Sequence, residues 1–139
     1  MDQQVQSKPT LGVLSAQDSA ASKSHWLFQA FLKQAFVLCV TTDILNEYAE
    51  IFEQKMSHAF SKSVMAILDN SENVEFVHKY YFWKAMPNDP DDDKYVDCAV
   101  ACNARCIVSH DRHFRVLKAL AWPKVAVMSL EEFRIFLEA

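Results

Sequence analysis

The chain has 139 residues, of which 51% are hydrophobic and 12% aromatic, and its formal net charge is −4. This length fits one domain with one core, and the hydrophobic fraction is too high for a disordered chain. The acidic balance argues against an overall basic nucleic-acid binder, and no apolar run approaches the ~20 residues of a membrane span. The polar start is also unlike a signal peptide, so we expect a soluble cytoplasmic protein with no membrane partner.

The N-terminal segment, residues 1–23, is polar and has no regular pattern. It contains the only glycine, Gly12, which interrupts a short apolar run. Pro9 precedes that run and lacks the N–H that a central strand requires. The sequence therefore predicts a poorly ordered or degenerate first strand in residues 1–23 and a folded domain in residues 24–139.

From Ser24 onward, strand-like and helix-like patterns alternate. Continuous apolar runs predict strands that are buried on both faces of a sheet, and apolar residues at helical spacing predict helices between them. Such alternation predicts an α/β fold, a three-layer α/β/α sandwich with a parallel central sheet. The strands are expected at 36–40, 74–77, 106–109 and 125–128, and the helices from Ser24, from Ile44, at 60–69, at 91–103, after Asp111 and from Ser129.

Two helix starts carry typical capping residues. Asp43 precedes Ile44 and can accept a hydrogen bond from an N–H group of the first turn. Ser129 is followed three residues later by Glu132, which is the spacing of a capping box. Helices are therefore expected to begin at both places.

An acidic stretch opens the helix expected at 91–103, and a fifth aspartate, Asp111, follows the next strand. Ligands bind to open parallel sheets outside the carboxyl ends of the strands. Carboxylates gathered there repel one another unless they are solvated or neutralised, and Mg²⁺ or Mn²⁺ is a suitable neutraliser. One aspartate can cap a helix, but four are more than a cap requires. The four are Asp89, Asp91, Asp92 and Asp93.

The four cysteines are expected to pack as small hydrophobic residues. Cys98 and Cys102 are four residues apart and share a helical face, but the short Cys-x-x-Cys spacing of zinc and cluster sites is absent. Disulfides are not expected in a cytosolic chain.

The aromatic segment at 80–83 has two interpretations. It can stack the bases of a single-stranded nucleic acid, or it can pack in a core or an interface. Packing is the commoner fate of such a cluster, and the sequence alone favours it.

Four segments in this order resemble the PIN-domain proteins, and more narrowly the toxin components of bacterial toxin–antitoxin systems. They are 41–48 (TTDILNEY), 89–93 (DPDDD), 107–111 (IVSHD) and 127–133 (VMSLEEF). The resemblance covers about residues 24 to 138. Members of that family are metal-dependent ribonucleases that hold one or two Mg²⁺ or Mn²⁺ ions with three or four carboxylates.

The resemblance implies that Glu47, Asp92 and Asp111 are the catalytic and metal-binding residues, with Asp89 and Asp93 as further candidates for the metal site. Asp92 is preferred to its neighbours because apolar or aromatic residues follow it at +3, +4 and +7, so that it is expected on the helix face that packs on the sheet. A bound metal lowers the pKa of water and stabilises charge on the phosphate, so no nucleophilic side chain is required.

The chain departs from the family at its first strand, which in the family ends in Asp-Thr-Asn and supplies a principal metal ligand. Counting back without gaps places Thr10, Leu11 and Gly12 at that motif, and none of them carries a carboxylate. Asp18 is the nearest other acid, and the sequence does not lead us to assign it to the site. Either the protein has lost this ligand or the N-terminus is not the native one. In both cases weak metal binding and slow or absent RNA cleavage are expected.

Three functions remain open from the sequence. The first is a metal-dependent endoribonuclease acting on single-stranded RNA, as the impaired toxin of a toxin–antitoxin pair. The second is a catalytically weak or inactive PIN-like module that binds RNA or a protein, and the third is a phosphohydrolase or phosphoacceptor domain. Expected partners are single-stranded RNA, an antitoxin protein and a second copy of the chain.

Overall fold

The computed structural model describes residues 10–20, 24–78, 82–86, 89–110, 112–119 and 124–139. The strands in this part of the chain are β1 (Leu11–Leu14), β2 (Val37–Val40), β3 (Val74–Phe76), β4 (Cys106–Val108) and β5 (Val127–Met128). The helices are α1 (Ala16–Ser19), α2 (His25–Leu32), α3 (Thr42–Lys55), α4 (His58–Asn70), α5 (Asp93–Cys102) and α6 (Leu130–Glu138), with the 3₁₀ helices η1 (Pro90–Asp92) and η2 (Arg112–Ala119).

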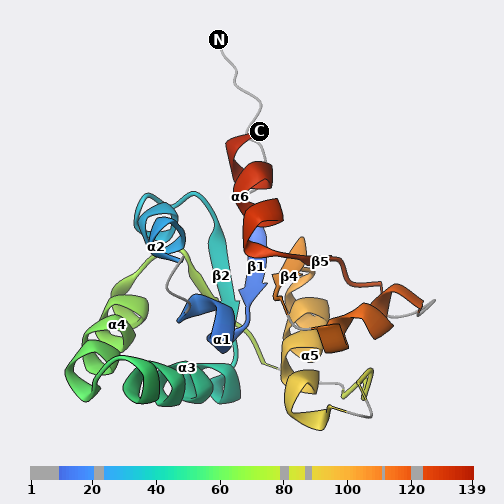
Figure 1. Cartoon of the computed structure of the whole chain (residues 1–139), viewed down its shortest axis with the longest axis horizontal. Helices are drawn as coiled ribbons and strands as arrows, with labels where there is room; N and C mark the ends of the chain where they lie inside the picture. The colour runs from blue at the N-terminus through green and yellow to red at the C-terminus, as the bar shows by residue number, and fades with distance from the viewer. Residues whose placement is uncertain (1–9, 21–23, 79–81, 87–88, 111, 120–123) are drawn as a thin grey trace.

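The strands form one parallel sheet in the order β3-β2-β1-β4-β5 (Figure 1). The chain therefore builds outward from β1 through β2 to β3, and then returns to the other side of β1 with β4 and β5. The direction of winding reverses between β1 and β4, and in such sheets the reversal opens a crevice at the carboxyl ends of the two strands. The expected α/β/α fold with a parallel sheet is confirmed.

The expectation of a degenerate first strand is wrong for Leu11–Leu14. This strand is central and has the same length as β2, and it pairs with β2 on one side and with β4 on the other. A Cβ atom added to Gly12 would lie 3.6 Å from the ring of Phe133, so the α6 phenyl ring fills the space beside the glycine. Pairing with a strand on each side compensates for the weak local pattern of β1. Residues 1–9, which were also expected to be poorly ordered, lie outside the described residues.

The other expected elements are present with small shifts at their ends. The helix expected at 91–103 is divided into η1 and α5, because Pro90 opens a separate 3₁₀ turn. The N-cap of α3 is Thr41, although the Asp43 carboxylate also accepts the Ile44 N–H, at 3.0 Å. The capping box at Ser129 and Glu132 is confirmed.

The core contains the aromatic residues Phe36, Phe114 and Phe133 together with most of the cysteines. All four cysteines lie in the described part of the chain, none forms a disulfide, and only Cys102 is partly accessible, which confirms their packing role. Within the aromatic segment Trp83 packs against the core, but Phe82 is 63% exposed. Among the described residues, no helix is long and apolar enough to cross a membrane.

Candidate active site at the carboxyl ends of the strands

A pocket of about 680 Å³ opens where β1 and β4 end, at the point where the winding of the sheet reverses. Its walls come from four parts of the chain: the β1–α1 segment, α3, the η1–α5 segment and the residues that follow β4. Five carboxylates line it. The lining residues are Ser15, Ala16, Gln17, Asp18, Glu47, Asp89, Pro90, Asp91, Asp92, Tyr95, Ser109, His110 and Phe114.

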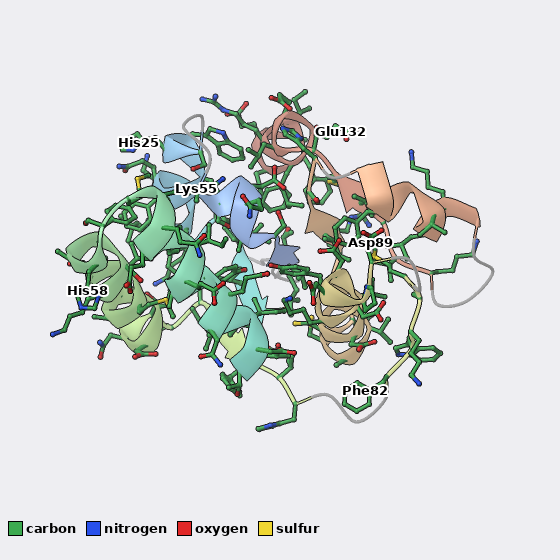
Figure 2. The ribbon with its side chains drawn as sticks, turned by 60° about the horizontal axis from the view of Figure 1, so that its bottom comes forward. His25, Lys55, His58, Phe82, Asp89 and Glu132 are labelled. Atoms are coloured by element: carbon green, nitrogen blue, oxygen red, sulfur yellow. The ribbon has the colours of Figure 1, made fainter. Side chains whose placement is uncertain are left out.

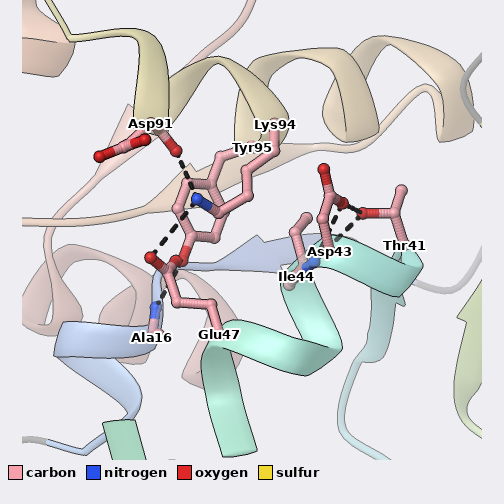
Figure 3. A network of polar contacts seen from close by, with 8 residues as sticks. All are labelled: Ala16, Thr41, Asp43, Ile44, Glu47, Asp91, Lys94 and Tyr95. Carbon is pink, nitrogen blue, oxygen red and sulfur yellow. Dashed lines mark hydrogen bonds and ion pairs between the residues drawn. The ribbon is translucent and has the colours of Figure 1, made fainter. Parts of the chain in front are cut away.

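One wall of the pocket is built around Glu47 of α3 (Figure 3). The hydroxyl of Tyr95 donates to Glu47 Oε1 and accepts the N–H of Ala16 at 3.1 Å, so it links α3, α5 and α1. Lys94 Nζ lies 3.4 Å from Glu47 Oε2, and it also donates to the Asp91 carbonyl oxygen at 2.5 Å. Both oxygens of Glu47 are therefore engaged by groups of the protein itself.

Burial raises the pKa of the Tyr95 hydroxyl well above its usual range, and the hydrogen bond to Glu47 raises it further. A tyrosine that stays protonated remains a hydrogen-bond donor at neutral pH. Tyr95 therefore acts as a fixed donor that orients the Glu47 carboxylate.

A second wall is built around Asp18, which the sequence did not lead us to assign to the site. Its Oδ2 accepts the Ser15 hydroxyl at 2.5 Å and the His110 N–H at 3.0 Å, so it ties the end of β1 to the end of β4. Asp18 is only 7% exposed. A local pattern in the sequence could have indicated the position of Asp18. A serine just after an apolar run, followed three residues later by an acid, is typical of a helix N-cap. The structure shows that cap, in which the Asp18 N–H donates to the Ser15 hydroxyl at 3.2 Å.

The acidic segment divides between two pockets. Asp89, Asp91 and Asp92 line the pocket with Glu47, whereas Asp93 lines an adjacent pocket of about 380 Å³ and accepts the Met86 N–H at 2.9 Å. The predicted residues Glu47, Asp92 and Asp89 are thus brought to one pocket, and Asp93 lies beside it. Asp111 lies outside the described residues. Within the described ranges, no three His, Cys, Asp or Glu side chains converge closely enough to hold a metal ion.

The residue at the end of the first strand is not the one that the ungapped count gave. Thr10 precedes β1 and Gly12 lies within it, and neither lines the pocket. The residue directly after β1 is Ser15, whose N–H bonds to the Val108 carbonyl of β4 at 3.1 Å. Ser15, and not Thr10 or Gly12, therefore occupies the strand-end position at the pocket.

In a comparison with protein-family models the chain matches the model of the PIN domain over residues 10–113. A search of curated proteins finds no match to the chain. The family model covers more than half of the chain and begins at the residue before β1, so it includes the strand that the sequence patterns had left in doubt. With the parallel sheet and the carboxylate-lined pocket in place, this match shows that the chain belongs to the PIN-domain family.

Proposed function

We propose that the protein is a metal-dependent endoribonuclease that acts on single-stranded RNA, with activity reduced by the serine at the end of β1. The observation that carries the proposal is the gathering of five carboxylates in one pocket at the reversal point of a PIN-type sheet. The uncharged Ser15 stands at the strand end, where the family places a carboxylate.

The donor set has the right chemistry for a hard divalent cation, because carboxylate oxygens are the ligands that Mg²⁺ and Mn²⁺ prefer. Glu47, Asp92 and Asp111 would hold the ion, with Asp89 as a neighbouring oxygen donor. When bound, the metal lowers the pKa of a water molecule and stabilises the charge that develops on the phosphate.

The side chains of the pocket have separable tasks in this proposal. Tyr95 holds the Glu47 carboxylate in one orientation, and Asp18 fixes the ends of β1 and β4, which form the floor of the pocket. A site whose parts are held in place before the substrate binds loses less energy to reorganisation during the reaction.

An RNA strand is favoured over a small phosphate ester by the surface next to the pocket. The adjacent pocket is lined by the exposed ring of Phe82 (Figure 2 shows Phe82 at the edge of the molecule), by two lysines, and by the aspartates Asp43, Asp91, Asp93 and Asp97. An exposed aromatic ring can stack on a base, so Phe82 is the feature of this surface that favours RNA.

The proposal extends to a cytoplasmic toxin of a toxin–antitoxin pair, with an antitoxin protein and a second copy of the chain as partners. Its support is the sequence resemblance at 41–48 and 107–111. The second candidate function is a PIN-like binding module without cleavage. The observation that favours it is the internal neutralisation of Glu47 by Lys94, together with Ser15 in place of a carboxylate.

The test restores a carboxylate at Ser15. We expect the natural chain to cleave a fluorescent single-stranded RNA slowly or undetectably in Mn²⁺, and Ser15→Asp to cleave it at least about tenfold faster, because an added ligand improves both metal affinity and positioning. Ser15→Asn is the control, because asparagine has nearly the same shape as aspartate but carries no charge. Thr10→Asp, outside the pocket, should not raise the rate.

Three results separate the candidates. Cleavage by Ser15→Asp that is lost on adding Glu47→Gln or Asp92→Asn supports the nuclease. Cleavage that survives both changes overturns the site. A folded Ser15→Asp protein that binds RNA and leaves it intact supports the binding module instead.

The role of Phe82 is tested separately by RNA affinity. Phe82→Ala should weaken binding of a short single-stranded RNA about tenfold in fluorescence anisotropy, since stacking contributes ~1–3 kcal/mol per base. Phe60→Ala on α4, which also removes an exposed phenyl ring, is the matched control and should leave affinity unchanged. Equal affinities of the two variants would exclude Phe82 from RNA binding.

A further inference from the structure

A lysine ammonium at the edge of the adjacent pocket lies against one of the two carboxylate oxygens of Glu47. Lys94 is in the first turn of α5, and its Nζ lies 3.4 Å from Glu47 Oε2 and 2.5 Å from the Asp91 carbonyl oxygen (Figure 3). The Lys94 side chain is only 16% exposed, and its ammonium lies between two oxygen acceptors. The same ammonium lies 5.4 Å from the centre of the Tyr95 ring, which adds a favourable cation–π contact.

The charges around Lys94 explain why it takes this position. The pocket contains four further carboxylates, Asp18, Asp89, Asp91 and Asp92, and close carboxylates repel one another unless a cation balances them. Glu47 receives the Tyr95 hydroxyl on Oε1 and the Lys94 ammonium on Oε2. The carboxylate is therefore satisfied by the protein alone.

A divalent cation cannot share this arrangement. Mg²⁺ binds carboxylate oxygen at about 2.1 Å, so an ion on Glu47 Oε2 would lie within a few ångströms of the Lys94 ammonium. Two cations at that separation repel each other strongly in a partly buried site. One of them must leave, and a lysine on a flexible stem can move away without unfolding the helix.

We propose that Lys94 is a tethered counter-ion that holds Glu47 when no metal is bound and must move away before a divalent cation loads, so that this one lysine sets the metal affinity of the pocket. The inference rests on the proposed function, in which the pocket binds Mg²⁺ or Mn²⁺. It goes further by naming the group with which the metal competes.

Metal binding, measured without RNA, tests this inference. Mn²⁺ is titrated by calorimetry into the natural chain and into Lys94→Met, Lys62→Met, Glu47→Gln and the Glu47→Gln/Lys94→Met double variant. Lys62 is exposed on α4 and does not line the pocket. Lys62→Met removes the same charge far along the chain from Lys94, so it is the matched control. The Mn²⁺-induced rise in melting temperature is recorded for each protein as a second readout.

The expected result is that Lys94→Met binds Mn²⁺ at least about tenfold tighter than the natural chain, since removing a competing charge is worth at least ~1.4 kcal/mol. Lys62→Met should match the natural chain, and Glu47→Gln should cancel the gain of Lys94→Met. The melting temperature of Lys94→Met should be lower than that of the natural chain without metal and should rise more when Mn²⁺ is added.

Other outcomes have distinct meanings. Equal Mn²⁺ affinity of the natural chain and Lys94→Met, weakened in both by Glu47→Gln, overturns the counter-ion role and leaves the metal site intact. No Mn²⁺ binding by any folded variant overturns the metal-dependent function and the counter-ion role together. If Lys94→Met does not fold, Lys94→Gln, which loses the charge but keeps a polar end for the Asp91 carbonyl, takes its place and is judged by the same criteria.

Discussion

The two walls of the pocket hold their carboxylates in different ways. Asp18 is 7% exposed and is bound by a neighbouring hydroxyl and a backbone N–H, neither of which carries a charge. Glu47 is 31% exposed and is bound by a tyrosine hydroxyl and a lysine ammonium. The first carboxylate joins two strand ends, whereas the second joins its own helix α3 to two neighbouring side chains of α5.

This difference separates a structural carboxylate from one that can exchange its partner. The His110 N–H that binds Asp18 is fixed in the backbone just after β4, but the Lys94 side chain can leave Glu47 by rotating about its own bonds. In the proposed function Glu47 is the acid that accepts a metal, whereas Asp18 links the ends of β1 and β4. The first two predictions below each change one wall and leave the other in place, and the third concerns the buried tyrosines.

The largest effect is expected at Asp18. Asp18→Ala leaves the buried Ser15 hydroxyl and His110 N–H without an acceptor and should lower the free energy of unfolding by about 3 kcal/mol in urea denaturation. Asp91→Ala removes an exposed carboxyl from the same pocket and should change stability by less than ~0.5 kcal/mol. Equal losses in the two variants would remove the distinction between the walls.

A smaller effect is expected at Tyr95, on the Glu47 wall. Tyr95→Phe removes the hydroxyl that accepts the Ala16 N–H and donates to Glu47, and it should cost about 1–2 kcal/mol of unfolding free energy. Glu47→Gln keeps an oxygen that can accept the Tyr95 hydroxyl, so it should lower the unfolding free energy by less than Tyr95→Phe does. A greater loss from Glu47→Gln than from Tyr95→Phe would mean that the ion pair with Lys94, and not the tyrosine, holds this wall together.

The smallest effect on stability at neutral pH is expected from ionisation of the buried tyrosines. The effect becomes measurable only at alkaline pH. Burial raises the pKa of both Tyr48 and Tyr95 above the ordinary value of 10.0. The folded protein thus holds these phenolic protons more tightly than the unfolded chain, so the associated stability is complete below about pH 10 and declines as the pH rises beyond it. The tyrosinate absorbance of these two residues should appear together with unfolding, and their titration at an ordinary pKa in the folded protein would contradict their burial.

Much of the fold followed from local pattern. The apolar run at 36–40 and the capping box at Ser129 and Glu132 each specify their element through nearby residues, and both appear as expected. The strand β1 did not follow from its own sequence, because a glycine and a short apolar run are weak signals by themselves. Its place at the centre is stabilised by β2, β4 and the Phe133 ring, which come from distant parts of the chain.

The sequence by itself determined the parallel α/β architecture and the placement of Glu47 and Asp92 near the strand ends, because hydrophobic period and chain order fix which ends of parallel strands meet. Only the tertiary structure decided which partners each acid has. The partners of Asp18 include a backbone N–H of His110, 92 residues away, and the Tyr95 partner of Glu47 is 48 residues away. Spacing along the chain does not predict such contacts, because they form only when the strand ends and helix starts are packed together.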